Sequence, residues 1–377
     1  MGNTPNIRFK GFTDDWEQRK LGEVFQEYSE KNHPELPALT IIQGGGTVLR
    51  EKSERKLQYD KSSLAWYKMV REDDFIVHLR SFEGGLEKSN HNGLISPAYH
   101  TFHGDEVDSR FYYPYFRSYE FIKHKLVPHV YGIRDGRSID IDGMKTIEIP
   151  WTSYEEQKKI GDYIESLDTL ITLHQRKCDE TKKLKKFMLQ KMFPKKDEKK
   201  PEIRFAGFTD DWEQRKLVDV VDVRSGRDYK HLEEGDIPVY GTGGYMLSVN
   251  EALSDDEDAI GIGRKGTIDN PYILRAPFWT VDTLFYAVPL DKYDLNFVFD
   301  IFQNVNWKAK DESTGVPSLS KATINAVETL MPEYAEQKKI GEYFSNLDNF
   351  ITLHQRKCDE IKKIKKFMLQ NMFPQKG

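Results

Sequence analysis

The chain has 377 residues, of which 38% are hydrophobic, 12% aromatic and 31% charged, and its formal net charge is −5. This length predicts two or three domains, and the aromatic content excludes a wholly disordered chain. Two cysteines exclude a disulfide-stabilised scaffold, and with no long apolar run and no apolar leader we expect a cytoplasmic protein without a membrane segment.

Two blocks of sequence each occur twice. Residues Ile7–Leu21 read IRFKGFTDDWEQRKL and recur at Ile203–Leu217 with one residue changed. A second block, Glu156–Pro194, recurs at Glu336–Pro374 with about three-quarters of its positions identical. Internal repeats on this scale indicate a duplicated architecture, and a solenoid is excluded because it needs three or more short repeats.

The segments between the repeated blocks, 22–155 and 218–335, differ in length and in most of their residues. Two near-identical frames around two dissimilar inserts predict one architecture that presents two different recognition surfaces. A duplicated enzyme is instead expected to keep its catalytic residues alike in both copies.

Both variable segments predict mixed α/β folds, because short β-rich runs occur together with aromatic-rich stretches of helical pattern. Asp74–Arg80 aligns without gaps to Asp258–Arg264, so we expect related folds with different loops. The predicted strands include Ala38–Gln43, Asp74–Leu79, Asp236–Tyr240 and Ala259–Gly263, and the predicted helices include Tyr112–Lys125 and Asn296–Val305.

The second repeated block predicts a long helix in each copy, ended by Pro194 and Pro374. Its seam residues recur at alternating steps of four and three, as in the a/d seam of a coiled coil. We expect the two apolar seams to pair antiparallel with pseudo-two-fold symmetry, and the alternative is that each helix docks separately on its own domain. The seam runs through Ile160, Ile164, Leu167, Ile171, His174, Cys178, Thr181, Lys185, Met188 and Met192, and through the equivalent positions Ile340 to Met372.

The predicted fold class is therefore α/β (α+β), with two globular mixed domains separated by two long helices that pair as an antiparallel coiled coil. The expected boundaries are 1–154 for the first globular domain, 155–194 for the first helix, 195–202 for a linker, 203–334 for the second globular domain and 335–377 for the second helix.

Motifs for catalysis are incomplete. Gly261-Ile-Gly-Arg-Lys-Gly266 has the letters of a dinucleotide-binding loop, but no helix start follows it, so we interpret it as a glycine-rich turn. Asp269-Asn-Pro-Tyr272 lacks the second proline of the motif of adenine amino-methyltransferases. No G-x-x-x-x-G-K-[ST], H-E-x-x-H or paired CxxC motif occurs. We predict no catalytic residue, and a self-sufficient methyltransferase is a remote third alternative.

Two histidine–cysteine pairs occupy the helical seams. His174 and Cys178 are four residues apart, as are His354 and Cys358, and antiparallel pairing brings all four together. Two histidines and two cysteines can bind zinc. The alternative, which we favour, is that these residues fix the register of the pairing, so we predict no metal.

Several motifs frame the variable segments in a fixed order. EQKKI opens each helix, Leu-Asp follows within it (Leu167-Asp168, Leu347-Asp348), and the second segment carries Gly241-Thr-Gly-Gly244, Gly263-Arg-Lys-Gly266 and Thr314-Gly-Val-Pro-Ser-Leu319. Over nearly its whole length the chain resembles the specificity subunit of a type I restriction–modification system. The first segment departs from the motifs, with Arg80-Ser-Phe-Glu-Gly-Gly85 and Gly132-Ile-Arg-Asp-Gly-Arg-Ser138 at the equivalent places.

The resemblance implies that each variable segment is a target recognition domain that reads one half-site of a bipartite double-stranded DNA target. The helices would set the gap and dock two DNA methyltransferase (modification) subunits, which carry S-adenosylmethionine and methylate adenine N6. Restriction/translocase subunits would use ATP and magnesium. The alternative is a coiled-coil scaffold with two ligand-binding domains and no DNA role.

Candidate base-reading residues are polar side chains on glycine-rich turns, because small neighbours let the backbone approach a base edge. We expect the repeated Phe9, Phe12 and Trp16, and their second copies Phe205, Phe208 and Trp212, to pack against the helices or a partner. The candidates are Gln43, His78, Arg80, Arg134 and Arg137 in the first segment, and Tyr240, Tyr245, Arg264, Lys265 and Ser318 in the second.

Overall fold

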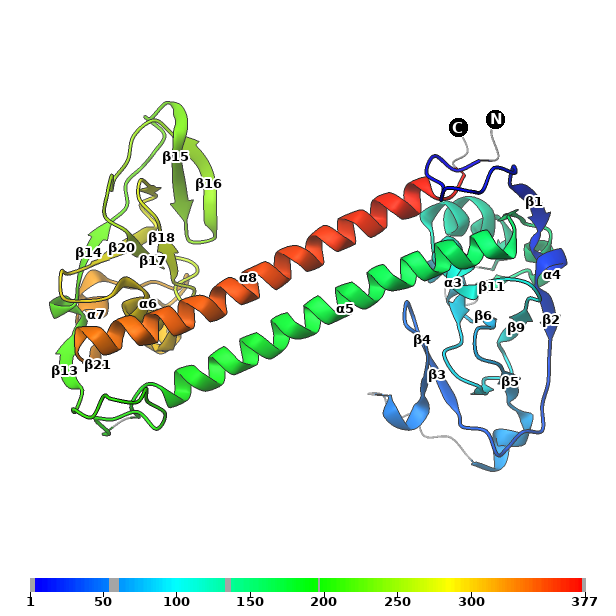
Figure 1. Ribbon diagram of the computed structural model, residues 1–377, viewed down its shortest axis with the longest axis horizontal. Coiled ribbons are helices and arrows are strands. Elements are labelled where there is room, and N and C mark those ends of the chain that lie inside the picture. Colours follow the sequence, from blue (N-terminus) through cyan, green and yellow to red (C-terminus); the bar gives the residue numbers. More distant parts are fainter. Residues whose placement is uncertain (1–3, 54–60, 133–136, 196, 375–377) are drawn as a thin grey trace. The chain divides into compact units, whose positions relative to one another are not determined.

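A computed structural model describes residues 4–53, 61–132, 137–195 and 197–374. It divides into two compact units. Unit 1 comprises Met1–Leu173 and Lys357–Gly377, and unit 2 comprises His174–Arg356. The long helices α5 (Tyr154–Lys191) and α8 (Tyr334–Asn371) each contribute residues to both units (Figure 1).

Unit 1 is built on a four-stranded antiparallel sheet in the order β2-β9-β6-β7. These strands are β2 (Gln26–Tyr28), β9 (His100–His103), β6 (Phe75–Val77) and β7 (Glu87–Lys88). Four strand pairs surround the sheet: β1 (Glu17–Lys20) with β12 (Glu148–Trp151), β3 (Leu39–Ile42) with β4 (Gly46–Leu49), β5 (Lys68–Val70) with β8 (Gly93–Ile95), and β10 (Val130–Tyr131) with β11 (Ser138–Ile139).

Short helices complete unit 1. The α-helices are α1 (Leu21–Val24), α2 (Ser81–Gly84), α3 (Ser109–Phe116) and α4 (Ile141–Lys145). The 3₁₀ helices are η1 (Arg50–Lys52), η2 (Lys61–Trp66) and η4 (Val127–His129), and η3 (Glu120–Leu126) is a π-helix.

The core of unit 1 is aromatic. On α3, Tyr112 and Phe116 pack against Phe25 and Phe75 of the sheet region, with ring centroids 4.9–5.6 Å apart in edge-to-face contacts. The helical stretch predicted over Tyr112–Lys125 forms two helices, α3 and η3, separated by a bend at Arg117 and Ser118, and the Ser118 hydroxyl accepts a hydrogen bond from Phe121 N–H at 3.1 Å.

Unit 2 repeats this plan with longer strands. Its main sheet is antiparallel in the order β14-β20-β17-β18, formed by β14 (Val221–Ser225), β20 (Leu284–Pro289), β17 (Ala259–Gly263) and β18 (Tyr272–Leu274). A second sheet contains β16 (Gly244–Val249), β15 (Glu234–Gly241) and β19 (Trp279–Thr280), and β13 (Glu213–Lys216) pairs with β21 (Glu328–Met331). The helices are η6 (Leu217–Asp219), α6 (Leu295–Asn304), η7 (Trp307–Lys310) and α7 (Lys321–Asn325).

The core of unit 2 lies between α6 and the main sheet. Asp294 caps α6 by accepting a hydrogen bond from Phe297 N–H at 2.9 Å, and Phe297 and Phe302 are fully buried with Ile260 and Ile262. The predicted strands Asp236–Tyr240 and Ala259–Gly263 and the predicted helix Asn296–Val305 are confirmed by β15, β17 and α6.

The two long helices pair antiparallel within each unit. In unit 1 the early part of α5 meets the late part of α8, where Lys365 bonds Asp168 and the Cys358 thiol lies 3.9 Å from the Ile171 carbonyl. In unit 2 the late part of α5 meets the early part of α8, and Lys185 Nζ lies 2.6 Å from both Asp348 oxygens. All the predicted seam residues are buried or half-buried, so the predicted pairing is confirmed and separate docking is excluded.

Each copy of the first repeated block, Ile7–Leu21 and Ile203–Leu217, packs on the start of a long helix. We call the resulting group the anchor of a unit: Arg8, Trp16 and Glu156 in unit 1, and Arg204, Trp212 and Glu336 in unit 2. The arginine forms two hydrogen bonds to the buried glutamate, at 2.6 and 2.8 Å in unit 1 and at 2.7 Å twice in unit 2. Both tryptophans are 1% exposed. The rings of Phe9 and Phe205 lie 5.8 and 6.1 Å from those of Tyr163 on α5 and Tyr343 on α8, so the expected packing on the helices is confirmed for these two phenylalanines.

Within the described part of the chain, the structure contains no helix with the length and apolar character needed to cross a membrane.

Candidate nucleic-acid interface

In unit 2, two glycine-rich segments far apart in sequence meet at Lys265. Lys265 forms an isolated antiparallel bridge with Ser318, and Gly266 N–H donates a hydrogen bond to the Pro317 carbonyl at 2.8 Å. A Cβ on Gly266 would lie 3.8 Å from the Thr242 hydroxyl, which places the Gly241–Gly244 turn beside them. The structure therefore gathers three of the predicted motifs on one part of unit 2.

Arg264 leaves β17 at a tight turn. A Cβ on the preceding Gly263 would approach the Thr267 carbonyl oxygen to 1.9 Å, so only glycine fits this close return of the chain. Arg264 N–H donates to the Thr283 carbonyl at 2.8 Å, and its guanidinium reaches the Asp282 carbonyl at 3.4 Å. The backbone is thus fixed, while the Arg264 and Lys265 side chains remain exposed.

The β15–β16 hairpin presents the two predicted tyrosines differently. Gly244 in its turn has φ +104°, a conformation that favours glycine. Tyr245 is 62% exposed, whereas Tyr240 is half-buried and packs against the Tyr272 ring at 6.0 Å. Tyr245 is therefore available to a ligand, and Tyr240 supports the hairpin from inside.

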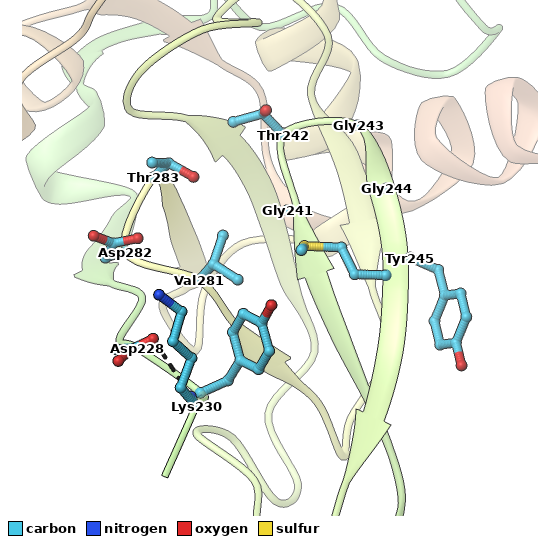
Figure 2. Close-up of a pocket in the computed structure, with 12 residues that line it drawn as sticks. Asp228, Lys230, Gly241, Thr242, Gly243, Gly244, Tyr245, Val281, Asp282 and Thr283 are labelled. Atoms are coloured by element: carbon cyan, nitrogen blue, oxygen red, sulfur yellow. Dashed lines mark hydrogen bonds between the residues drawn. The ribbon is translucent and has the colours of Figure 1, made fainter. Parts of the chain in front are cut away.

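An open pocket of about 700 Å³ lies beside this hairpin. Figure 2 shows the turn Gly241–Gly244 along one side and Asp228, Lys230 and Asp282 along the other, with Tyr245 pointing away from Asp282. The lining mixes both signs of charge with backbone groups, which suits a polar ligand better than an apolar one. Its residues are Asp228, Tyr229, Lys230, Gly241, Thr242, Gly243, Gly244, Tyr245, Met246, Val281, Asp282 and Thr283.

In unit 1, the predicted arginines meet at helix α2. Glu83 of this helix forms an ion pair with Arg80 at 3.0 Å and lies 3.8 Å from the Arg137 guanidinium. Arg137 also stacks over the Phe82 ring, 4.4 Å from its centroid. One carboxylate thus orients two exposed guanidinium groups that come from distant parts of the chain. The predicted Arg134 lies outside the described residues.

The other two predicted residues of unit 1 adjoin the same helix. The amide of Gln43 lies so close to Gly84 that a Cβ there would be 2.1 Å from Gln43 Nε2. His78 N–H donates to the Ser81 hydroxyl at 2.9 Å. Burial lowers the pKa of His78, so its imidazole is neutral at neutral pH and can donate or accept a hydrogen bond. Four of the five candidates of the first segment therefore surround α2.

A buried group of side chains around Glu87, close to Gln43, was not predicted from the sequence. Glu87 is 0% exposed and is contacted by Arg117 and Tyr113 of the α3 region. The sequence offered little signal, because the three residues lie 26 and 30 positions apart and their grouping depends on how α3 packs on the sheet.

The histidine–cysteine pairs have ordinary packing partners. His174 Nδ1 and His354 Nδ1 are 2.9 Å apart in unit 2, and the Cys178 thiol lies 3.7 Å from the Gln355 side-chain oxygen. Among the residues that the structure describes, no group of three or more histidines, cysteines, aspartates or glutamates is arranged to hold a metal ion. The contact between His174 and His354 is the kind of seam contact that the register interpretation expects, and the absence of a bound metal remains a prediction.

Comparison with known proteins finds similarity to one family. Residues 209–363 match the family described as Type I restriction modification DNA specificity domain. The MjaVIII type I restriction enzyme specificity subunit of Methanocaldococcus jannaschii is 26% identical over 270 residues, which cover 60% of this chain and 61% of that protein. The putative MjaX specificity subunit of the same organism is 24% identical over 61% of this chain and 59% of its own length.

The chain thus aligns with about three-fifths of the length of these curated relatives. Its fold is similar to the crystal structure of the S subunit of a type I restriction–modification system from M. genitalium, with a TM-score of 0.70 and 16% sequence identity. That similarity covers 99% of this chain and 100% of the other.

Proposed function

Because this chain belongs to the family of type I restriction–modification specificity subunits, we propose that it reads a bipartite double-stranded DNA target, one half-site per unit. One observation carries this proposal: two near-identical anchors hold two different groups of polar side chains, most of which are exposed. A protein that bound one ligand twice would repeat its binding residues along with its anchors. Here the anchors are repeated and the exposed residues are not.

The chemistry of the two groups suits base edges. We call Gln43, His78, Arg80 and Arg137 the first cluster, and Tyr245, Arg264, Lys265 and Ser318 the second cluster. Arginine and lysine recognise the acceptors of guanine, and glutamine recognises the donor–acceptor pair of adenine in the major groove. With a net charge of −5, the chain depends on such local groups, and on its partners, for contact with the negative DNA backbone.

A duplicated apolar surface supports docking of two identical partners. Exposed apolar residues recur on α5 and α8 at the same repeat positions, each directly before a seam residue, and are 42–55% exposed. In an antiparallel helix pair, these positions of both helices lie on one side of the pair. Unit 1 carries Leu170, Leu173, Ile364 and Phe367, and unit 2 carries Leu184, Phe187, Phe350 and Leu353.

We assign these two surfaces to two DNA methyltransferase subunits, each with its own S-adenosylmethionine and each methylating adenine N6. Restriction/translocase subunits that use ATP and magnesium would join the same complex. In this proposal the specificity chain performs no bond-making step. Its residues bind and orient DNA so that the partners act at one site.

The experiment that tests the proposal is methylation-sensitive sequencing of DNA exposed to the chain co-expressed with an adenine methyltransferase partner. We expect one bipartite motif with a fixed gap. Binding to random duplex DNA should fall steeply with salt and strengthen with the partner present. Modification without sequence preference would contradict the proposal, and binding that is insensitive to salt would favour the scaffold alternative.

The gap itself tests the role of the helices. Inserting four residues, about one helical turn, between Gln190 and Pro194 lengthens α5 by roughly 6 Å. DNA rises about 3.4 Å per base pair, so we expect the gap to grow by one or two base pairs while both half-sites stay the same. A two-residue insertion, which rotates the helix by more than half a turn, should reduce activity instead. An active four-residue variant with an unchanged gap would show that helix length does not set the spacing.

A further inference from the structure

A buried carboxylate lies directly beneath the tip of the β3–β4 hairpin in unit 1. Glu87, on β7, is 0% exposed. Its Oε1 accepts a hydrogen bond from Gly44 N–H at 2.7 Å, and its Oε2 accepts one from Gly46 N–H at 3.1 Å. Both backbone amides belong to the turn that follows Gln43. One carboxylate therefore holds two of the three glycine amides of this turn.

Two further donors hold this carboxylate in place. Arg117 donates to Oε1, and the Tyr113 hydroxyl donates to Oε2 at 2.7 Å. The Arg117 guanidinium also lies 5.5 Å from the Tyr113 ring centroid. A buried charge is stable only when it is paired and hydrogen-bonded, and both conditions are met here. Glu87 thus has four donors, two of which come from the loop above it.

The turn needs this support because of its backbone conformation. Gly44 and Gly46 have φ of +83° and +71°, and a Cβ on Gly46 would lie 2.5 Å from the Lys88 carbonyl oxygen. The Asn90 amide donates to the Gly45 carbonyl at 2.8 Å, which holds the turn from a second direction. Because two of its amides and one carbonyl are held by hydrogen bonds, the turn places the Gln43 side chain next to Gly84 of α2.

We propose that Glu87 is a positioning residue that sets the specificity of the first half-site by fixing the turn that presents Gln43. This inference rests on the proposed function, because it supposes that the first cluster reads DNA. Glu87 does not touch the DNA in this proposal. It acts through the Gly44 and Gly46 amides, and the charge-assisted hydrogen bonds give the turn a single geometry.

The test uses the full-length chain in complex with its methyltransferase partner and a random-sequence duplex library. Glu87→Gln keeps the shape, but its NH₂ group cannot accept a hydrogen bond from a glycine amide. We expect discrimination at one position of the first half-site to fall about five- to 150-fold, the range for one bidentate base contact. The second half-site should not change. Gln43→Ala should relax the same position.

A double-mutant cycle separates positioning from a merely structural role. If Glu87 acts through Gln43, adding Glu87→Gln to Gln43→Ala should change specificity little further. The matched control is Asp74→Asn, since Asp74 is also a buried carboxylate of this sheet, 2% exposed, but bonds Tyr28 and His103 away from the turn. It should lower stability and leave specificity unaltered.

A second variant keeps the proposal testable if Glu87→Gln does not fold. Gly44→Ala disturbs the turn from the other side, because its Cβ would lie 3.0 Å from Arg117 Nη2 at a positive φ. It should relax the same base position. Unchanged specificity in both variants, or full additivity in the cycle, would overturn the inference while the wild-type complex still selects a bipartite motif. A wild-type complex without any motif would instead overturn the proposed function.

Discussion

The two units fix their recognition loops by different means. In unit 1 the β3–β4 turn is held by a buried charged side chain, Glu87, which accepts hydrogen bonds from Gly44 and Gly46. In unit 2 the Arg264–Gly266 turn is held by backbone hydrogen bonds to Thr283 and Pro317. Loops of different sequence can therefore be rigid inside the same repeated frame, because each is stabilised locally and the frame only fixes where each insert begins and ends.

The two anchors also differ in their hydrogen bonds, although they consist of the same residue types. In unit 1, Glu156 accepts hydrogen bonds from Trp16 Nε1 at 3.0 Å and from the Thr152 hydroxyl, in addition to Arg8. In unit 2, proline 332 occupies the position of Thr152, and within the described residues Trp212 Nε1 has no hydrogen-bond partner. Identical repeated residues are therefore not energetically equivalent, since an unrepeated neighbour completes the network in one unit only.

The largest expected effect comes from exchanging one insert. Replacing residues 219–333 with the matching segment of a relative should change the second half-site completely and leave the first intact, because each anchor holds its own insert. Methylation-sensitive sequencing of the chimera with its partner gives the result. A simultaneous change in both halves would show that the inserts are not independent.

The next effect concerns the two anchors. Arg204→Ala leaves the buried Glu336 without its arginine and should cost ~3–5 kcal/mol of unfolding free energy. Arg8→Ala should cost about 1–2 kcal/mol less, because Glu156 keeps its bonds from Trp16 and Thr152. Urea unfolding of both variants measures the difference, and equal losses would show that these extra bonds contribute nothing.

Single arginines of the two clusters should have smaller and separable effects. Arg264→Ala should cost roughly 1–3 kcal/mol of DNA-binding free energy and relax one position of the second half-site only. Arg80→Ala is the matched variant for the first half-site. Competition binding with single-base variants of the target distinguishes the roles. Uniformly weaker binding with unchanged specificity would reassign the arginine to a phosphate contact.

The smallest expected effect is a loss of stability of the paired helices at acid pH. Both units have an isoleucine–cysteine contact in the seam, and unit 2 has in addition His174 beside His354. Burial, then the charges of His174 and Lys177, lower the pKa of His354 below its ordinary 6.5. As pH falls through about 6.5, the unfolded chain takes up a proton that the folded helix pair resists, so stability should fall.

His354→Gln should remove part of this acid sensitivity without changing stability at pH 8. Hydrogen exchange of the seam amides between pH 5 and 8 measures it separately in each unit. Equal acid sensitivity in the two units, or no change in the His354→Gln variant, would contradict the role of the histidine pair.

Periodic patterns of apolar residues in the sequence correctly predicted several of the helices and strands. The seam from Ile160 to Met192 predicted the long helix α5. Apolar residues that recur every 3.5 positions form one edge of a helix, and packing against a second helix buries that edge. The strand at Ala259–Gly263 and the helix at Asn296–Val305 were predicted for similar reasons. The helical stretch predicted over Tyr112–Lys125 is helical but interrupted, since α3 ends at Phe116 and the chain bends at Arg117 and Ser118 before η3 begins.

The candidate site was only partly visible in the sequence. Glycine-rich turns identified Arg264, Lys265 and Ser318, and the structure brings these together through the Lys265–Ser318 bridge. Tyr240 was selected with Tyr245, its partner on the neighbouring strand, yet it is half-buried, because its ring packs against both Tyr245 and Tyr272. That the ten candidate residues contact DNA bases remains a prediction.

The sequence by itself determined the duplication, the two long helices and their antiparallel pairing, because repeats and helical periodicity are local and depend on few neighbours. Only the tertiary structure decided which side chains share a site. Glu87, Arg117 and Gly44 are distant in sequence, and their hydrogen bonds exist because the fold brings the β3–β4 hairpin and the end of α3 to one buried carboxylate. A buried charge must find its partners wherever the fold supplies them, and no local pattern in the chain records which partners those are.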